Sequence, residues 1–420
     1  MVVLTYHFLS IIYISAKVPH SAISKIFYMM VTKLNNKYTT HEGTEFVMDC
    51  LNQVLEETGD SFRFPKRVPT FANRNALLNC SNEGIKAFVV CPKCHALHES
   101  DNHGVQCDKP MANAVWVSTH ASFYCTGNLL ALNNRVPPTM SLQMKYAYCS
   151  VKATLGKFLM RRGFAEQLAE WKHRRTIDGH FLDLQDASMF NQFKALPTDA
   201  MSFAYESNYN LQLALNMDWF SPFEHSYSVG CIYMSILNLP KQNGRDLKKN
   251  MILVGVIPGP SEPPTTAINH YLEPLVKEML ELLQGVDLQV MLMDGTVVYN
   301  KVRAAITLIS CDLPATKKFI GSLSFNSHRA CHMCDLVFPS LPDGVSKHNY
   351  CDWNCDSWRQ KDSAVPRQAS EQWIRATTKA ARSNITAATG SRYSILHQLP
   401  YFSYDLVALE PMHCLFFWYR

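Results

Sequence analysis

The chain has 420 residues, which is enough for two or three domains. Its hydrophobic content of 47% and charged content of 18% exclude a disordered chain and predict a sizeable core. The net charge of +5 at pH 7 permits nucleic acid as a partner without requiring it.

The N-terminal region, residues 1–75, is predicted to be helical. Val2–Val18 is apolar but carries scattered polar residues, is short for a membrane span and has no preceding basic residue. We therefore expect it to form a buried helical hairpin with Ile23–Met30, and we expect no membrane association. Pro65 and Pro69 mark an extended linker. Without an export signal, the cysteines are expected in a reducing compartment, where CxxC pairs indicate zinc rather than disulfides.

A cysteine- and histidine-rich module follows at residues 80–130. Its pattern of one CxxC pair and two later cysteines can supply four thiolates to a tetrahedral Zn²⁺, the ligands being Cys91, Cys94, Cys107 and Cys125. Four histidines compete as ligands: His95, His98, His103 and His120. The alternative is that these cysteines are buried free thiols.

Residues 140–195 are predicted to be helical, with an amphipathic pattern from Tyr146 to Trp171. The pattern runs into a short basic cluster, Lys172 to Arg175. This cluster either contacts phosphates or is a solvated helix end without a function.

Residues 205–325 carry the pattern of an α/β core. Leu211–Met217 alternates apolar and polar side chains, which predicts a strand, and this strand ends on Asp218. Two apolar runs, Val229–Leu237 and Met251–Ile257, are typical of strands buried on both faces.

A helix is predicted next, starting near Tyr271 or Leu272 so that Pro274 falls in its first turn. Asp294-Gly295 indicates a hairpin between Val286–Met293 and Thr296–Tyr299. The strand Ala304–Cys311 then ends on Asp312.

Three strands, a helix and a further strand form the order of a ribonuclease-H-like mixed sheet, in which the first and fourth strands are neighbours. Asp218 and Asp312 are therefore expected to converge at adjacent strand ends. Carboxylate oxygens are the ligands that Mg²⁺ and Mn²⁺ prefer, so the pair indicates half of a two-metal site for phosphoryl transfer. The alternative is that each aspartate merely caps a turn.

Several ordered motifs in the chain resemble the transposases of CACTA (En/Spm-like) DNA transposons, in the form common in fungi. In the core they read NMDWFSPFEHSYSVGCIYMSILNLP, MILVGVIPGPSEP, INHYLEPLVKEMLELLQGV and RAAITLISCDLPATKKFIGSLSFNSHRACHMC. Outside it they read GIKAFVVCPKC, RYSILHQLPYF and ALEPMHCLF. The resemblance covers most of the chain from about residue 84.

This resemblance implies a nuclear enzyme that cleaves and joins phosphodiesters at the ends of a transposon. Such enzymes use two aspartates and a glutamate, of which Asp218 would be the first and Asp312 the second. It also implies double-stranded DNA as the partner, Mg²⁺ or Mn²⁺ at the acids, and a possible homo-oligomer.

A second CxxC, Cys331 and Cys334 preceded by His328, resembles one that the family carries in an insertion, here residues 326–400. It is a further expected zinc site. Its remaining ligands stay open among Cys351, Cys355 and His348.

Two departures from the family pattern bear on activity. The family's Asp-Pro-Met-His reads Glu410-Pro411-Met412-His413 here, and a side chain one methylene longer shifts whatever it holds. The C-terminal part, residues 401–420, stops soon after this motif, and the third acid has no evident counterpart. We therefore expect a truncated copy. The alternatives are a catalytically inactive, zinc-stabilised remnant that binds DNA or protein, and an unrelated α/β zinc protein.

Overall fold

The computed structural model describes residue 31 and residues 40–57, 63–64, 66–67, 84–100, 104, 106–109, 125, 127–132, 140–221, 227–245, 247–341, 348–349, 356 and 359–409. The chain divides into two compact units, Met1–Glu83 and Gly84–Arg420, which are described separately.

The first unit contains helix α3 (His41–Glu57). Its apolar face, Met48, Leu51 and Leu55, packs with Val31 and Phe64 into a small core. This agrees with a helical N-terminal region, whereas the predicted hairpin of Val2–Val18 and Ile23–Met30 lies outside the described residues. Across the described part of the chain, no helix combines the length and apolar character that crossing a membrane requires.

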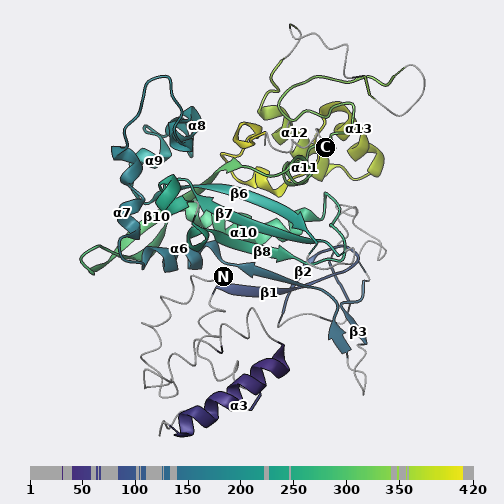
Figure 1. Ribbon diagram of the computed structural model, residues 1–420. Helices are drawn as coiled ribbons and strands as arrows, with labels where there is room; N and C mark the ends of the chain where they lie inside the picture. The colour runs from purple at the N-terminus through teal and green to yellow at the C-terminus, as the bar shows by residue number, and fades with distance from the viewer. Residues whose placement is uncertain are drawn as a thin grey trace. The chain divides into compact units, whose positions relative to one another are not determined.

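The second unit is a mixed α/β structure (Figure 1). Its strands are β1 (Ile85–Val90), β2 (Leu97–Glu99), β3 (Leu130–Leu132), β4 (Met140–Leu142), β5 (Lys145–Cys149), β6 (Asn210–Phe220), β7 (Val229–Ile236), β8 (Ile252–Ile257), β9 (Val286–Met291) and β10 (Val297–Ile309). Its α-helices are α6 (Val151–Leu159), α7 (Phe164–Gln167), α8 (Ser188–Gln192), α9 (Phe203–Glu206), α10 (Ile268–Gln284), α11 (Leu313–Ile320), α12 (Ala364–Arg375) and α13 (Lys379–Thr389). Short helical turns are η3 (Glu170–His173), η4 (Leu184–Asp186), η5 (Lys241–Arg245), η6 (Lys248–Asn250), η8 (Ile395–Gln398) and η9 (Tyr404–Leu406).

Eight strands form one sheet in the order β2-β1-β5-β8-β7-β6-β10-β9. Consecutive strands β6, β7 and β8 pair as antiparallel neighbours. Strand β10 returns after α10 and pairs parallel to β6, with Ala304 opposite Leu211 and Ile309 opposite Leu215. The prediction that the first and fourth core strands lie side by side is confirmed, and this pairing positions both candidate acids.

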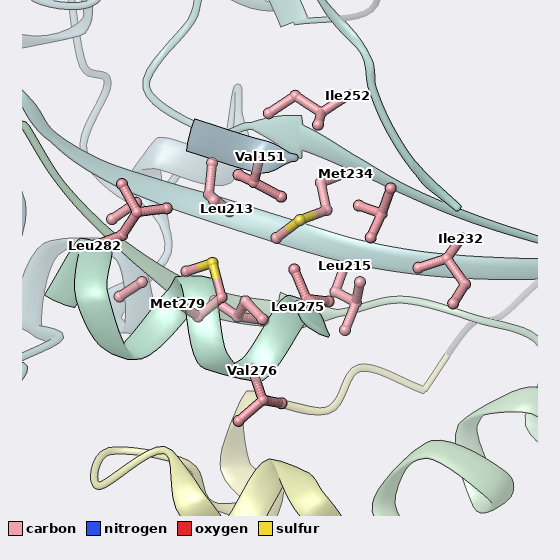
Figure 2. Packing of buried hydrophobic residues seen from close by; sticks show 14 of the residues in the cluster. Val151, Leu213, Leu215, Ile232, Met234, Ile252, Leu275, Val276, Met279 and Leu282 are labelled. Carbon is pink, nitrogen blue, oxygen red and sulfur yellow. The ribbon is translucent and has the colours of Figure 1, made fainter. Parts of the chain in front are cut away.

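One face of the sheet is packed against α10. Leu213 and Leu215 of β6 and Met234 of β7 meet Leu275 and Met279 of the helix, as Figure 2 shows. Because side chains alternate along a strand, the residues between them on β6 point to the opposite face. That opposite face is covered near Ala214 by Trp171, Phe190, Ala204 and Leu237, and it becomes progressively more exposed toward Asp218.

The helix predicted from Tyr146 begins only at Val151, so this prediction was wrong for its first turn. Residues Lys145–Cys149 instead form β5, in which Tyr146 and Tyr148 are buried and their neighbours are more exposed. Hydrogen-bonded pairing with β1 on one side and β8 on the other overrides the helical pattern. The close-packed Tyr146 ring would meet any side chain at Gly255 of β8 within 3 Å.

Two further boundaries and one burial pattern differ from the prediction. Helix α10 starts at Ile268, so Pro274 lies inside it rather than in its first turn, and its buried face still contains the predicted apolar residues. The predicted strands Thr296–Tyr299 and Ala304–Cys311 are one strand, β10, whose first half forms the expected hairpin with β9. Strand β7 alternates buried and half-buried residues instead of being buried on both faces.

Candidate functional site

The four predicted zinc ligands lie together. The Sγ atoms of Cys91, Cys94, Cys107 and Cys125 are all within 4.8 Å of one another, and three of these side chains are buried. Cys91 Sγ lies 3.6 Å from Cys125 Sγ, and Cys94 Sγ lies 3.7 Å from Cys107 Sγ. These separations exclude disulfides, since bonded sulfurs are about 2 Å apart. They match the roughly 3.8 Å between sulfurs that bind one tetrahedral Zn²⁺ at about 2.3 Å.

The surroundings of the cysteine cluster are adapted to this close approach. A Cβ at Gly127 would lie 2.7 Å from Cys91 Sγ, so only glycine fits there. His98 lies beside the cluster, with Nε2 3.3 Å from Cys107 Sγ, whereas His95 turns away and places Nδ1 2.9 Å from the Tyr271 hydroxyl on α10. His103 and His120 lie outside the described residues. The structure therefore favours a set of four thiols, which can hold a metal ion.

The two candidate acids sit where β6 and β10 end side by side. Asp218 is exposed on β6, opposite Cys231 of β7, two residues before the end of the strand. Asp312 follows β10 and forms the N-cap of α11, accepting a hydrogen bond on Oδ1 from the Ala315 backbone N–H at 2.7 Å. Asp312 therefore has the capping role that was the alternative to metal binding, and this role leaves Oδ2 for another ligand.

Cys311 lies between the two acids. The Met217 backbone N–H donates to its Sγ at 3.1 Å. The thiol thus accepts the hydrogen bond that a backbone carbonyl of β10 would accept if the strand continued. Burial, with a smaller contribution from the negative charges of Asp312 and Asp218, raises the pKa of this thiol to about 12. Cys311 is therefore a buried, protonated thiol next to Asp312 in the chain and hydrogen-bonded to the residue before Asp218. Within the described part of the chain, no third carboxylate, histidine or cysteine joins them in a ligand-distance group.

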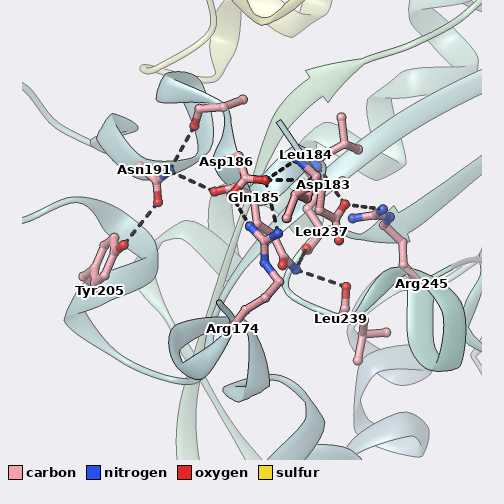
Figure 3. A network of polar contacts seen from close by, with 12 residues as sticks. Arg174, Asp183, Leu184, Gln185, Asp186, Asn191, Tyr205, Leu237, Leu239 and Arg245 are labelled. Atoms are coloured by element: carbon pink, nitrogen blue, oxygen red, sulfur yellow. Dashed lines mark hydrogen bonds and ion pairs between the residues drawn. The ribbon is translucent and has the colours of Figure 1, made fainter. Parts of the chain in front are cut away.

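A polar network holds the segment before α8 against the sheet (Figure 3). Arg174, from the predicted basic cluster, forms a two-point ion pair with Asp186, with one contact at 3.1 Å. Arg245 pairs with Asp183 at 2.6 Å, and both side chains are buried. Gln185 donates to the carbonyl oxygens of Leu237 and Leu239 at 2.8 and 3.1 Å. Arg174 thus has a structural contact rather than a solvated or phosphate-facing position.

The second CxxC lies in a loop held by buried lysines. Lys361 Nζ donates to the Cys331 carbonyl oxygen at 3.2 Å, and Lys317 Nζ donates to that of Ala330 at 2.5 Å. Burial lowers the pKa of Lys317 to about 8. The loop therefore keeps a backbone geometry that depends on two desolvated amines.

His328 Nδ1 lies 2.6 Å from the Phe338 carbonyl oxygen, and its ring packs 4.4 Å from that of His348. Among the described residues, His328, Cys331 and Cys334 do not form a second group of three ligands. Cys351 and Cys355 lie outside the described residues, as do the motif residues Glu410 and His413. Their roles as ligands or motif residues therefore stay predictions.

The sequence reasoning missed the polar side chains that share the face of Asp218. Strand pairing puts Asn216 opposite Tyr233 and Ala214 opposite Ser235. Leu308 of β10 pairs with Ala214, and Ser310 directly follows the end of β10. The period-two pattern that located Asp218 also carried Asn216, and Ser310 stands two residues before Asp312. Their spacing was therefore a usable signal.

Residues 178–371 match the model of a protein family described as transposase family tnp2. The matched segment contains β6 to β10, both candidate acids and the network of Figure 3 except Arg174, but it excludes the cysteine cluster. No curated protein matches the chain. The similarity supports a transposase-like function.

Proposed function

We propose that this chain is a DNA transposase whose Asp218 and Asp312 hold divalent metal for phosphodiester cleavage and strand transfer at transposon ends. The observation that carries the proposal is the parallel pairing of β6 with β10, which brings both acids to adjacent strand ends. The match of residues 178–371 to a transposase family supports it. The strand order β8-β7-β6-β10 is that of the ribonuclease-H-like fold, which we propose for this core.

The two carboxylates fit a hard divalent cation such as Mg²⁺ or Mn²⁺, because both offer oxygen ligands at the solvent-facing end of the sheet. Asp218 would bind through an exposed carboxylate, and Asp312 through the oxygen not used for capping α11. A bound ion supplies activation of the attacking oxygen and stabilisation of the leaving oxygen in an in-line displacement. The chain itself orients that site, since the N-cap hydrogen bond fixes the carboxyl of Asp312.

For the cysteine cluster we propose a structural role with bound Zn²⁺. Burial raises the pKa of the Cys94 thiol, so a thiolate at this position needs a cation beside it. All four ligand positions are filled by protein, as in structural zinc sites. We further propose a CACTA-like enzyme, double-stranded transposon-end DNA as the partner, assembly as a homo-oligomer and a nuclear location.

A second candidate function is an inactive, zinc-stabilised remnant that binds DNA or protein. It is favoured by the capping role of Asp312, which would keep that residue in place without any metal. The two candidates differ in one respect that can be measured, namely whether Asp218 is needed for metal binding and cleavage.

The test uses Asp218→Asn, which removes a ligand charge at an exposed position, and Asp287→Asn, an exposed aspartate on β9, as the matched control. Mn²⁺ binding is followed by electron paramagnetic resonance, and nicking of supercoiled plasmid is followed in Mg²⁺ or Mn²⁺. We expect the Asp218 variant to lose nicking by about a hundredfold or more, beyond the ~10–100-fold typical of outer-shell changes, with an unchanged melting temperature.

The control variant should nick and bind Mn²⁺ like the parent protein. Nicking and Mn²⁺ affinity that survive Asp218→Asn intact would rule out the proposed site. If the parent protein binds DNA but neither binds Mn²⁺ nor nicks the plasmid, the inactive remnant is favoured.

A further inference from the structure

A groove of about 560 Å³ lies on the same sheet face as the acids. Its floor includes Asn216 of β6, Ser235 of β7 and Ser310, which follows β10. Asn216 stands two residues before Asp218, and Ser310 stands two residues before Asp312. Ser235 stands two residues after Tyr233, which is paired with Asn216. The acids themselves do not line the groove, but they stand two residues beyond Asn216 and Ser310, which do.

The wall of the groove is apolar and exposed. Phe181 is 79% exposed, Leu182 49% and Leu184 45%, and all three line the groove. Exposed apolar side chains that lie together along a groove are a feature of ligand-binding surfaces.

The network of Figure 3 holds this wall in place. Asp186 accepts hydrogen bonds from the backbone N–H groups of Leu182 and Asp183 at 2.7 and 2.9 Å, and Arg174 neutralises its charge. The residues that follow Phe181 are thus fixed from inside the protein. The aromatic ring is presented toward solvent by an ordered segment, which lowers the entropic cost of binding a flat ligand.

The chemistry of the groove combines a flat apolar wall with hydrogen-bonding floor groups and a cation. Lys241, at the start of η5, is exposed and lines the groove. Stacking on an aromatic ring, hydrogen bonds to base edges and a basic side chain for phosphate are the elements by which proteins hold unpaired nucleotides. The volume lies within the range of pockets that bury a small ligand of nucleotide size.

We propose that the groove binds one unpaired nucleobase of a DNA strand, stacked on Phe181, next to the phosphodiester presented to Asp218 and Asp312. The identity of the strand as DNA rests on the proposed function. The placement of the base rests on the groove, its wall and the position of the acids two residues beyond its floor.

The test measures binding of a fluorescein-labelled, 12-nucleotide single strand by fluorescence anisotropy, without added Mg²⁺ or Mn²⁺. Phe181→Ala removes the stacking ring, and Tyr299→Ala removes an aromatic side chain of similar exposure, 70%, on the β9–β10 hairpin. A second strand has its central four bases replaced by abasic residues. Stacking contributes about 1–3 kcal/mol per base, so we expect Phe181→Ala to weaken binding of the normal strand about tenfold or more.

Tyr299→Ala should bind within about twofold of the parent protein. The parent should bind the abasic strand as weakly as Phe181→Ala binds the normal strand, and the Phe181 variant should show no further loss on the abasic strand. Equal affinity of the parent and Phe181→Ala, an equal loss on both strands, or no single-strand binding at 100-fold excess protein over the dye-labelled strand overturns the inference.

The failure of this inference is separable from that of the proposed function. Base-dependent binding that needs Phe181, without metal-dependent nicking, refutes only the catalytic proposal. Nicking that needs Asp218, with no effect of Phe181→Ala on single-strand binding, refutes only the base-binding groove.

Discussion

The cysteine cluster and the acidic face are two candidate ligand sets that differ in burial and in sequence separation. The four thiols come from one stretch of 35 residues, from Cys91 to Cys125, and three of the four are buried. The two acids, Asp218 and Asp312, are 94 residues apart in sequence and are placed at neighbouring strand ends by the pairing of β6 with β10. Asp218 is exposed to solvent there. A closed ligand set stabilises a fold, whereas an open one leaves room for a substrate. The difference predicts that mutations at the first site act on stability and those at the second on chemistry.

The largest expected effect is at the closed site. Cys91→Ser removes a buried ligand, and structural zinc contributes about 10–16 kcal/mol of apparent binding energy in small domains, so the module around β1 and β2 should unfold. We expect elemental analysis to find about one zinc lost per chain, with a lower melting temperature. Cys50→Ser, at an exposed free thiol on α3, is the control and should leave both unchanged. If the parent protein, purified under reducing conditions, contains no zinc, the cysteine cluster is not a metal site and the contrast with the acids fails.

The intermediate effect concerns the support of the open face. Arg174 keeps the pKa of Asp186 low, at about 2, mainly through its hydrogen bonds, with help from the backbone N–H groups of Asp183 and Leu182. Because the folded-state pKa lies below the unfolded value of about 3.9, this carboxylate stabilises the fold above about pH 4. The stabilisation is lost as pH falls from about 4 toward 2.

Arg174→Met should therefore lower stability at neutral pH by about 1 kcal/mol, since the pair is only partly shielded from water. It should also flatten the acid limb of a plot of melting temperature against pH. Arg375→Met, which breaks an exposed ion pair on α12, is the matched control and should leave that limb unchanged. An acid limb that is equally steep in the Arg174 variant would show that Asp186 does not depend on this contact.

The smallest expected change in stability is that of Asp312→Asn, which separates the two roles of Asp312. Asp312→Ala removes the N-cap of α11 and should cost about 1 kcal/mol, whereas asparagine caps nearly as well and should cost a few tenths. Both variants should lose Mn²⁺ affinity, since neither carries a carboxylate charge. Chemical denaturation and Mn²⁺ titration of the same samples give the two quantities. If Asp312→Asn keeps its Mn²⁺ affinity and only the less stable Asp312→Ala loses it, the carboxylate charge is not needed for metal binding. Asp312 would then be a structural residue, like the cysteines of the cluster.

Local patterns predicted that the four cysteines lie together, because they are close in sequence and the CxxC spacing is itself a geometric constraint. These patterns did not choose between these thiols and the neighbouring histidines as ligands. Alternation along Leu211–Met217 predicted β6, and strand order predicted its neighbour β10. Tyr146 was assigned to a helix because residues 146–171 are apolar at helical spacing, and nothing local indicated that Tyr146 and Tyr148 would pair with β1 and β8. Pairing between distant segments decides such positions.

The site was predicted less fully than the fold for the same reason. Asp312 ends a strand and begins a helix, and sequence alone did not separate metal binding from capping, because Leu313-Pro314 suits both a turn and a helix start. Arg174 was read as surface charge because its partner Asp186 stands 12 residues away in an irregular segment. His328 was grouped with Cys331 by proximity in sequence, whereas its ring packs on His348.

The pairing of β6 with β10 also has a consequence for the order of folding. The four clustered cysteines lie within 35 residues of sequence, whereas Leu211 pairs with Ala304 across 93 residues. Closing a long loop is the slower event, since its entropy is lost before the contacts form. We therefore expect the cysteine module to acquire metal early, while the acidic edge forms only when the last core strand docks. On this expectation, a nascent chain would bind metal at the cysteines before its pair of carboxylates is assembled.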